Sequence, residues 1–435
     1  MEILGVFFKF ILSFALILIA ARIGGEIAER YLKQPAVIGE LVAGIAISPF
    51  ALGGLINDPI ILNFAAIPTV NLPAAWGLGG LPPDTEFNVM EIISEIAVVA
   101  LLFVAGVETN VRAFLRQGKT GALVAVGGVV LPFIFGYFIT MLFYPEAGSA
   151  GWLFMGAVLT ATSIGITVRI LMDMKRLHTK EGTTILVAAV IDDIIGIVIL
   201  SVVMSVAATG AINVLEAIRI AIVGFVIWFA LIMIGVKFHK RISRFVLTPF
   251  KRSGTMPIAA IIVGFLIAYL VTLVDLHPVV GAYAAGLMFA ATAEKEEIIE
   301  KTRPIMLFLA PFFFCFLGMQ VDVPLLAAGA AVAGILIVLA TLGKIVGCYV
   351  PARLAGKLSH NESMIVGVGM VPRGEVGLII AGVGLTMHAV SMELFGVAVA
   401  VSIVTTLIVP SMLKPLFRRQ VVPASESEES EEPPG

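Results

Sequence analysis

Apolar segments of roughly the length of a membrane-spanning helix recur along almost the whole chain. An α-helix rises about 1.5 Å per residue, so about 20 apolar residues cross the hydrocarbon core of a bilayer. The pattern predicts an all-α polytopic membrane protein with thirteen transmembrane helices. The thirteen segments are residues 3–22, 36–54, 90–108, 118–143, 150–171, 183–208, 214–236, 255–273, 277–293, 304–319, 324–350, 362–386 and 391–416.

Basic residues fall on alternate connections between these segments. Counted from the connection after the first segment, every second connection is basic, and so is the flank that follows the last segment. Together these stretches hold 24 of the 28 Lys and Arg residues, and the intervening connections hold none. The positive-inside rule then places the N-terminus outside and the C-terminus in the cytoplasm of a cell membrane. The composition agrees, because only 13% of residues are charged, against about 25% in a soluble domain. A net charge of −2 gives no indication of a nucleic-acid partner.

The two halves of the chain show a weak internal repeat. LLFVAGVE at 101–108 and FFCFLGMQ at 313–320 share an aromatic, apolar and glycine pattern that aligns Gly106 with Gly318, an offset of 212. The segments that carry these motifs are the third and the tenth, so they run in opposite directions through the membrane. This predicts an inverted-topology repeat, the architecture of many secondary transporters.

Two adjacent carboxylates, Asp192 and Asp193, interrupt the apolar segment 183–208. They lie about ten residues from the nearest polar flank, which is about 15 Å and close to the bilayer midplane. A carboxylate there costs about 2.5–3.5 kcal/mol, which favours function over packing, although a structural ion pair is the alternative. Consecutive helix residues point about 100° apart. We therefore expect Asp193 to face an ion pathway and Asp192 to be held by a buried lysine, Lys344.

Two stretches combine glycine with hydroxyl residues or proline: Leu159–Thr167 (LTATSIGIT) and Gly367–Leu378 (GVGMVPRGEVGL). Such stretches break membrane helices and expose backbone carbonyls, although close helix packing is the alternative explanation. Corresponding broken helices in the two halves indicate a transport site. Arg373 and Glu375 in the second stretch are predicted to form a buried structural pair, with Arg169 as another possible partner of Glu375.

Seven motifs occur in an order that resembles the monovalent cation:proton antiporters, specifically their NapA-like branch, over about residues 1–417. They are QPAVIGELVAGI (34–45), LLFVAGVE (101–108), TATSIGIT (160–167), AAVIDDIIG (188–196), HPVVGAYAAGL (277–287), GKIVG (343–347) and VPRGEVGLI (371–379). The resemblance implies a homodimer in the lipid bilayer, two crossing broken helices, and an elevator motion of a core domain against a dimerisation domain.

The resemblance also implies a division of the chain. Residues 1–116 would belong mainly to the dimerisation domain, 117–208 and 324–417 would form the two halves of the ion-transporting core, and 209–323 would supply linking and dimerisation helices. The remaining segment, 418–435, is rich in glutamate, and its composition is typical of a disordered acidic tail.

Residue roles follow from the matching motifs. The family's ion-binding carboxylate, which binds Na⁺ or protons, corresponds to Asp193, and its neighbour corresponds to Asp192. The lysine that pairs with this neighbour corresponds to Lys344. The unwound segments of the broken helices correspond to Thr162–Ser163 and Val371–Gly374, and Thr162 and Ser163 are accordingly expected to contribute to cation binding.

The sequence thus predicts a Na⁺/H⁺ antiporter that needs no cofactor, and the family resemblance implies that its exchange is electrogenic. A K⁺/H⁺ or Li⁺/H⁺ antiporter, a cation channel and another kind of solute carrier remain alternatives. An enzyme is disfavoured, because no phosphate loop, nucleophile triad or metal cluster is present. An intramembrane aspartic protease is a poor fit as well, since adjacent aspartates on one helix cannot share one water.

Overall fold

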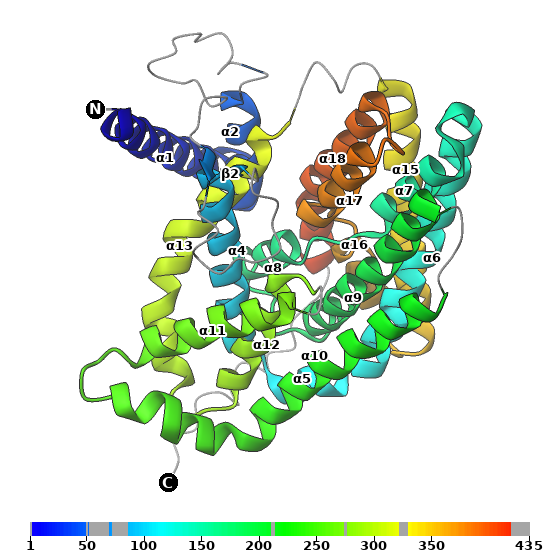
Figure 1. The fold of residues 1–435 in the computed structure, drawn as a ribbon. Coiled ribbons are helices and arrows are strands. Elements are labelled where there is room, and N and C mark those ends of the chain that lie inside the picture. The colour runs from blue at the N-terminus through cyan, green and yellow to red at the C-terminus, as the bar shows by residue number, and fades with distance from the viewer. Residues whose placement is uncertain are drawn as a thin grey trace.

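The computed structural model describes residues 2–48, 51, 69–71, 86–209, 214–273, 276–321 and 329–418. Helices dominate these residues, which confirms the predicted all-α class (Figure 1). Within the described part of the chain, the exception is one short antiparallel pair, β1 (Thr69–Asn71) with β2 (Glu86–Asn88).

Each of the thirteen predicted segments coincides with one helix or with a pair of helices. The first half contains α1 (Glu2–Ile27), η1 (Ala28–Leu32), α2 (Ala36–Ile47), α4 (Val89–Glu108), α5 (Val111–Arg116), α6 (Gly118–Phe143), η4 (Pro145–Ala147), α7 (Gly148–Thr160), α8 (Ile164–Asp173) and α9 (Lys180–Thr209). The second half contains α10 (Val214–Ile242), η5 (Ser243–Leu247), η6 (Thr248–Phe250), α11 (Met256–Thr272), α12 (Pro278–Ala290), α13 (Lys295–Met319), α15 (Ala330–Leu354), α16 (His360–Gly369), α17 (Glu375–Thr386) and α18 (Met392–Arg418).

Several of these helices are long and apolar enough to cross a membrane. By length and composition the described residues contain eight such helices, or up to nine if the bent pair within 222–250 forms one span. Shorter apolar helices lie at α2, α11, α12 and α17. These features identify a multi-pass membrane protein, whereas the number of thirteen crossings stays a prediction.

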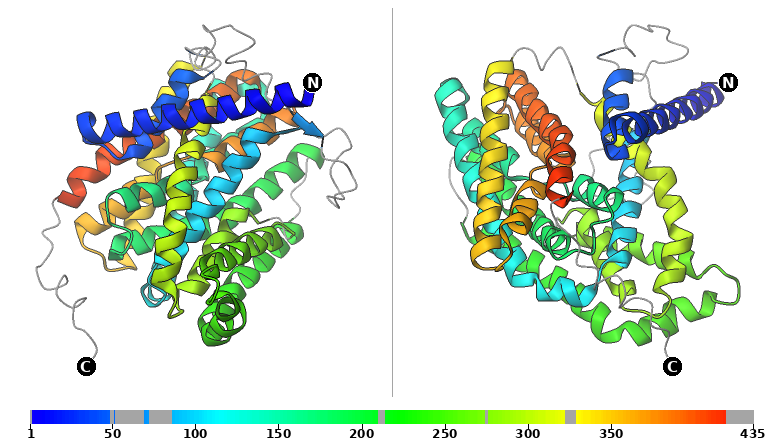
Figure 2. Two further views of the ribbon diagram at one scale, coloured as in Figure 1. Left: turned by 90° about the vertical axis from the view of Figure 1, so that its left-hand side faces the viewer. Right: turned by 180° about the vertical axis from the view of Figure 1, so that it is seen from behind.

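The helices pack in two groups, which lie on opposite sides of the molecule in Figures 1 and 2. One group consists of α1, α2, α4, α11, α12 and α13, and the other consists of α6, α7, α9 and α15–α18. Helix α10 packs against α12 of the first group and α9 of the second. Helix α8 also lies between the groups, in contact with α2, α4 and α9.

The helix boundaries repeat with the offset that the motifs indicate. Helices α6 and α15 begin 212 residues apart, and so do α7 and α16, and α9 and α18. The chain between α7 and α8 therefore has a counterpart between α16 and α17. Each half of the chain thus contains one broken helix at a corresponding position.

Two glycines set the distance between α6 and α15. A Cβ atom on Gly127 would lie 2.1 Å from the carbonyl oxygen of Gly347, and one on Gly347 would lie 2.2 Å from that of Gly127. Small residues let membrane helices approach this closely, so that van der Waals contact stabilises the pair. The contact places the side chain of Lys344 beside Gly128, where a Cβ would lie 3.4 Å from Cε of the lysine. The close packing of α6 and α15 therefore places Lys344 in the interior of the second helix group.

Candidate functional site

The first helix break separates α7 from α8 at residues 161–163. Ala161 has an extended conformation (φ −58°, ψ 138°), and Ser163 is the N-cap of α8, where its Oγ accepts a hydrogen bond of 3.3 Å from the amide of Ile166. Serine favours this position because its side chain satisfies an amide that has no partner within the helix. The break leaves the last carbonyls of α7 without intrahelical partners in the buried centre of the bundle.

The second break separates α16 from α17 at residues 370–374. Pro372 has no amide hydrogen and disfavours a helical conformation in the residue before it. A Cβ atom on Gly374 would lie 2.8 Å from Oγ of Ser163, so glycine allows the two breaks to approach this closely. The segments Thr162–Ser163 and Val371–Gly374, which the family resemblance marks as unwound, lie within the two observed breaks.

The two breaks meet and bond to each other. The amide of Ser163 donates to the carbonyl of Pro372 over 2.9 Å, and Oγ1 of Thr162 donates to the carbonyl of Met370 over 3.1 Å. A third bond, from Oγ1 of Thr167 on α8, reaches the last residue of α16 over 3.2 Å. Polar groups of the first break thus satisfy carbonyls of the second, which holds the two broken helices together where they are unwound.

Arg373, from the second break, in turn satisfies a backbone carbonyl at the first break. Its guanidinium is 1% exposed and donates from Nε and Nη2 to the carbonyl of Leu159, over 3.1 and 2.8 Å. It also reaches the carbonyls of Val371 (3.0 Å) and Ala340 (3.2 Å). A cation at the C-terminal end of α7 complements the negative end of the helix dipole. The hydroxyl of Thr406 in turn donates to the carbonyl of Arg373 over 2.6 Å.

Lys344 joins Asp192 to the same helix end. Its ammonium lies 3.1 Å from Oδ1 and 3.3 Å from Oδ2 of Asp192, and donates to the carbonyl of Thr160 over 2.6 Å. Both charged side chains are almost completely buried. A buried pair offsets its desolvation only with good geometry and additional hydrogen bonds, and the bond to Thr160 is one of these.

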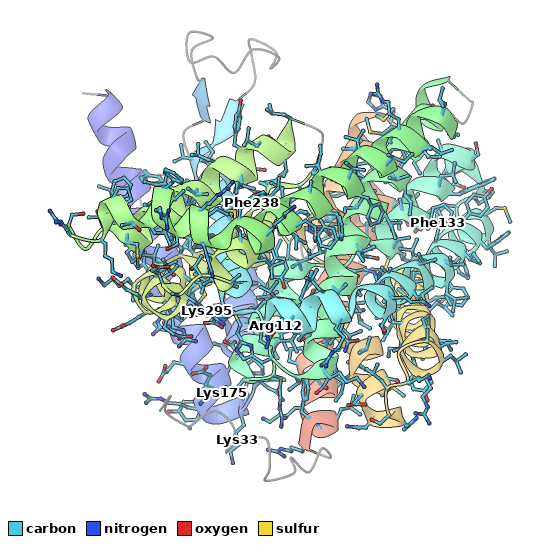
Figure 3. All side chains as sticks on the ribbon, turned by 90° about the horizontal axis from the view of Figure 1, so that it is seen from below. Lys33, Arg112, Phe133, Lys175, Phe238 and Lys295 are labelled. Atoms are coloured by element: carbon cyan, nitrogen blue, oxygen red, sulfur yellow. The ribbon has the colours of Figure 1, made fainter. Side chains whose placement is uncertain are left out.

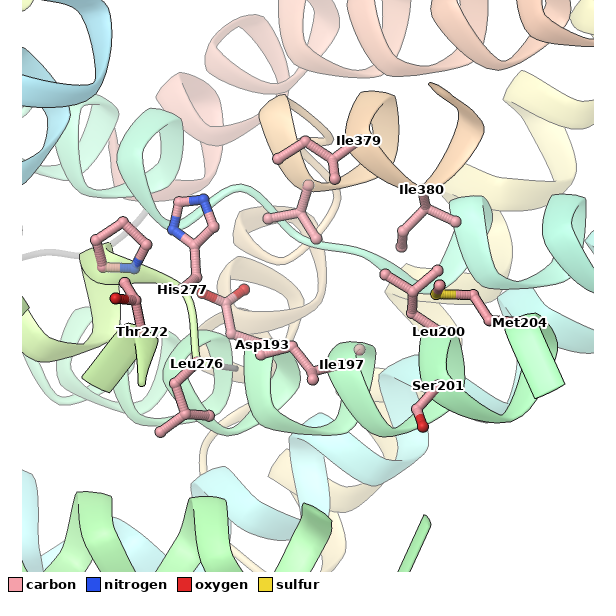
Figure 4. A pocket seen from close by; sticks show the side chains of 13 residues that line it. Asp193, Ile197, Leu200, Ser201, Met204, Thr272, Leu276, His277, Ile379 and Ile380 are labelled. Atoms are coloured by element: carbon pink, nitrogen blue, oxygen red, sulfur yellow. The ribbon is translucent and has the colours of Figure 1, made fainter. Parts of the chain in front are cut away.

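Asp193 has a different environment from its neighbour. It lines a cavity of about 600 Å³ that is bounded by α9, by α17 and by the connection from α11 to α12. Figure 4 shows its carboxylate pointing away from α9 into this cavity, toward the ring of His277. The adjacent aspartates therefore occupy two distinct settings, one in an ion pair and one at a cavity.

His277 lies at this cavity, a position that the sequence did not predict. It precedes α12, and among the described residues its Nδ1 has no hydrogen-bond partner. In the sequence it lies at the edge of an outer connection and 84 residues from Asp193, so no helical periodicity relates the two. The motif HPVVGAYAAGL contained it, but only the folded chain shows that it lines the same cavity as Asp193.

Arg169 occupies a place that the pattern of basic residues did not predict. It is buried within α8 rather than on a connection, with Nη2 3.3 Å from Oε1 of Glu40 and Nε 3.0 Å from Oδ1 of Asp173. Because Glu40 belongs to α2, this cluster links α8 to the first helix group. The side chain of Glu375 lies outside the described residues, so its pairing with Arg169 or Arg373 stays a prediction.

The described residues contain no group of three or more His, Cys, Asp or Glu side chains that could hold a metal ion. What they form is a single carboxylate at a cavity, beside two broken helices that bond to each other at their breaks. This arrangement is characteristic of secondary transporters, in which discontinuous helices build the substrate site near the middle of the membrane.

Comparison with known proteins agrees with this class. The family model described as "Sodium/hydrogen exchanger, transmembrane" matches residues 10–419. The chain is 35% identical over 426 residues to the high-affinity Na⁺/H⁺ antiporter NhaS3 of Synechocystis sp., covering 94% of this chain and 89% of the relative. It is 34% identical over 412 residues to the Na⁺/H⁺-K⁺ antiporter GerN of Bacillus cereus, covering 94% of this chain and 97% of the relative.

A solved structure shows the same fold. The sodium proton antiporter MjNhaP1 from Methanocaldococcus jannaschii superposes with a TM-score of 0.65 at 18% sequence identity, covering 97% of this chain and 98% of the other. The chain therefore belongs to the sodium/hydrogen exchanger family. It is a transporter and not an enzyme, and the predicted membership of the cation:proton antiporters is confirmed.

Proposed function

We propose that this protein is a secondary active antiporter that exchanges Na⁺ for protons across the cell membrane. The observation that carries the proposal is that two neighbouring carboxylates have different environments. Asp193 lines the cavity, whereas Asp192 is tied to Lys344 and to the end of α7. The names of the relatives NhaS3 and GerN, which both include Na⁺/H⁺ exchange, support the choice of substrates.

Asp193 is the group that couples the two fluxes. A carboxylate binds either a proton or an alkali cation, and the two compete because each neutralises the same negative charge. Hard oxygen ligands suit a small monovalent cation, and carbonyls at helix breaks serve this purpose in transporters. Thr162 and Ser163, at the first break, are the hydroxyl residues that the family motif indicates for completing the cation's shell.

The ion pair of Lys344 with Asp192 supplies a second charge that changes during transport. We infer that Lys344 gives up its proton and leaves Asp192 as Na⁺ binds, and that the pair forms again when the proton returns. One proton from Asp193 and one from Lys344 are then exchanged for one Na⁺, so that the number of positive charges moved in the two directions differs. Exchange is then electrogenic. The bond from Lys344 to the carbonyl of Thr160 supports this role, because it connects the pair directly to the broken helix.

The transport cycle is an elevator motion in a homodimer. The core, residues 117–208 and 324–417, would move against a dimerisation domain formed by residues 1–116 and by helices of 209–323. The packing of the helices in two groups supports this division. The position of α8 supports it as well, because this helix belongs to the proposed core and contacts α2 and α4 of the proposed dimerisation domain.

The structure corresponds in this scheme to an outward-facing state. The cavity extends from Asp193 along α9 to Met204, toward the end of the helix that the positive-inside rule places outside. On the cytoplasmic side, the cluster of Glu40, Arg169 and Asp173 joins α2 to α8. An inward-facing state requires this cluster to separate.

A K⁺/H⁺ antiporter is the second candidate, and the name of GerN, which includes K⁺, favours keeping it. Purified protein in proteoliposomes with an imposed pH gradient separates the possibilities. Added Na⁺ should dissipate the gradient at lower concentration than K⁺ or Li⁺, and a membrane potential should change the rate. A cation current without proton flux would instead show a channel.

A further inference from the structure

A second cavity, of about 440 Å³, lies between the two helix groups, away from Asp193. One wall comes from η1 and the connection that follows it, and the other comes from the α8–α9 connection and the last turns of α18. We call it the seam cavity, because the proposed core and dimerisation domains meet there. Its charged lining comprises Lys33, Arg176, Lys414, Arg418, Glu29 and Asp173.

The positive charge of the seam cavity is largely uncompensated. Among the described residues, none of its four basic side chains has an acidic group within 4.0 Å, whereas Asp173 is already paired with Arg169. Arg176 lies over the ring of Phe417, with 5.3 Å from Cζ to the ring centroid. Lys175 lies between the lining residues Met174 and Arg176 in the chain and on the same side of the molecule as Lys33 in Figure 3, so it adds to the local positive charge.

The acidic segment of the chain begins just beyond this cavity. Helix α18 ends at Arg418, which itself lines the cavity, and residues 426–432 contain five glutamates and no basic residue. An extended chain spans at most about 3.3–3.6 Å per residue, so the eight residues from Arg418 to Glu426 reach about 26–29 Å. The glutamates can therefore reach every wall, and their covalent attachment gives them a millimolar effective concentration there.

We propose that Glu426–Glu432 docks in the seam cavity and acts as a brake on exchange. An occupant that contacts Lys33 on one wall and Lys414 on the other must leave before the walls can slide past each other. This inference rests on the proposed function, since only a sliding motion is slowed in this way. The contact is electrostatic and accessible to water, so salt weakens it.

Docking can be measured without transport. Spin labels on Ser427→Cys in the acidic segment and on Gln34→Cys, an uncharged lining residue of the cavity, report their separation in the full chain, reconstituted in neutral-lipid nanodiscs. Cys315 and Cys348 are buried and are replaced by alanine for this purpose. At low ionic strength, we expect a narrow distribution of distances between the two labels, centred at a short separation. It should broaden in about 1 M choline chloride, where the screening length is about 3 Å.

Reversing the charge of two lining residues tests whether the acidic segment binds to the basic residues of the cavity. K414E/R418E should broaden the distribution even at low salt. The matched control K251E/R252E makes the same change of net charge at exposed residues of another connection and should leave it narrow. A broad distribution in the unaltered cavity, or an equal effect of both charge reversals, would overturn docking.

Exchange rates test the brake. Changing all five glutamates to glutamine should raise the rate about fivefold or more at low salt. K414E/R418E should do the same, and combining the two changes should add nothing further. Unchanged rates despite a narrow distance distribution would overturn the brake. An effect of K414E/R418E that appears only with anionic lipid would assign the cavity to lipid headgroups and would also overturn it. If no form exchanges Na⁺ for protons, the proposed function fails, but the distances still decide docking.

Discussion

Lys344 Nζ lies 3.1 Å from Oδ1 of Asp192, with both side chains almost completely buried. The pair joins α15 to α9, and through the carbonyl of Thr160 it also joins the end of α7. Three helices of one group therefore depend on a single ammonium group. Its removal affects both the stability of the protein and the charge carried in transport.

Replacing Lys344 with alanine should destabilise the protein. The change leaves Asp192 as a buried carboxylate without its partner, and breaking a buried pair in this way costs about 3–5 kcal/mol. The midpoint of thermal unfolding in detergent should fall clearly. K344Q/D192N, which removes both charges, should recover much of the loss. Equal midpoints for the single and double variants would contradict a stabilising ion pair.

Arg373→Lys should also destabilise the protein, despite its conserved charge. The guanidinium holds the carbonyls of Leu159, Val371 and Ala340 at once, which the single ammonium of lysine cannot reproduce. Each lost hydrogen bond from a charged group contributes about 1.5–3 kcal/mol. Arg353→Lys is the matched control, because Arg353 is partly exposed and donates to one carbonyl. Similar unfolding midpoints for the two variants would count against a special role for Arg373.

The charge of Glu40 should stabilise the outward-facing state. Glu40→Gln keeps a hydrogen-bond acceptor for Arg169 but weakens the contact between α2 and α8. Fewer molecules are then in the outward-facing state that binds Na⁺ from outside, so the half-saturating concentration of external Na⁺ should rise. Glu26→Gln, which removes a charge from an exposed pair with Arg30, should leave it unchanged. An unaltered half-saturating concentration in Glu40→Gln would contradict the proposed closure.

Competition at Asp193 predicts a specific pH dependence. Protons and Na⁺ bind the same carboxylate, so lowering the pH should raise the half-saturating Na⁺ concentration while saturating Na⁺ restores the rate. Initial rates of exchange, measured across Na⁺ concentrations at several pH values, test this. If pH altered only the maximal rate, binding of the two ions would be independent.

The local features of this fold could be predicted from the sequence, since they depend on nearby residues. Pro372 and Gly374 mark the second break, and the 212-residue offset relates it to the first. The partners of buried charges could not be derived from periodicity, because they depend on how distant helices pack. Arg373, for example, donates to the carbonyl of Leu159, 214 residues away. Arg169 meets Glu40, 129 residues away.

The Asp193→Asn variant in proteoliposomes tests the central claim most directly. Asparagine preserves the shape of the side chain but cannot exchange a proton for Na⁺. The account predicts no Na⁺-driven dissipation of a pH gradient, with a thermal unfolding midpoint close to that of the unaltered protein. Asp192→Asn, the matched control one residue away, should retain exchange that no longer responds to membrane potential. Full Na⁺/H⁺ exchange by Asp193→Asn would contradict the account.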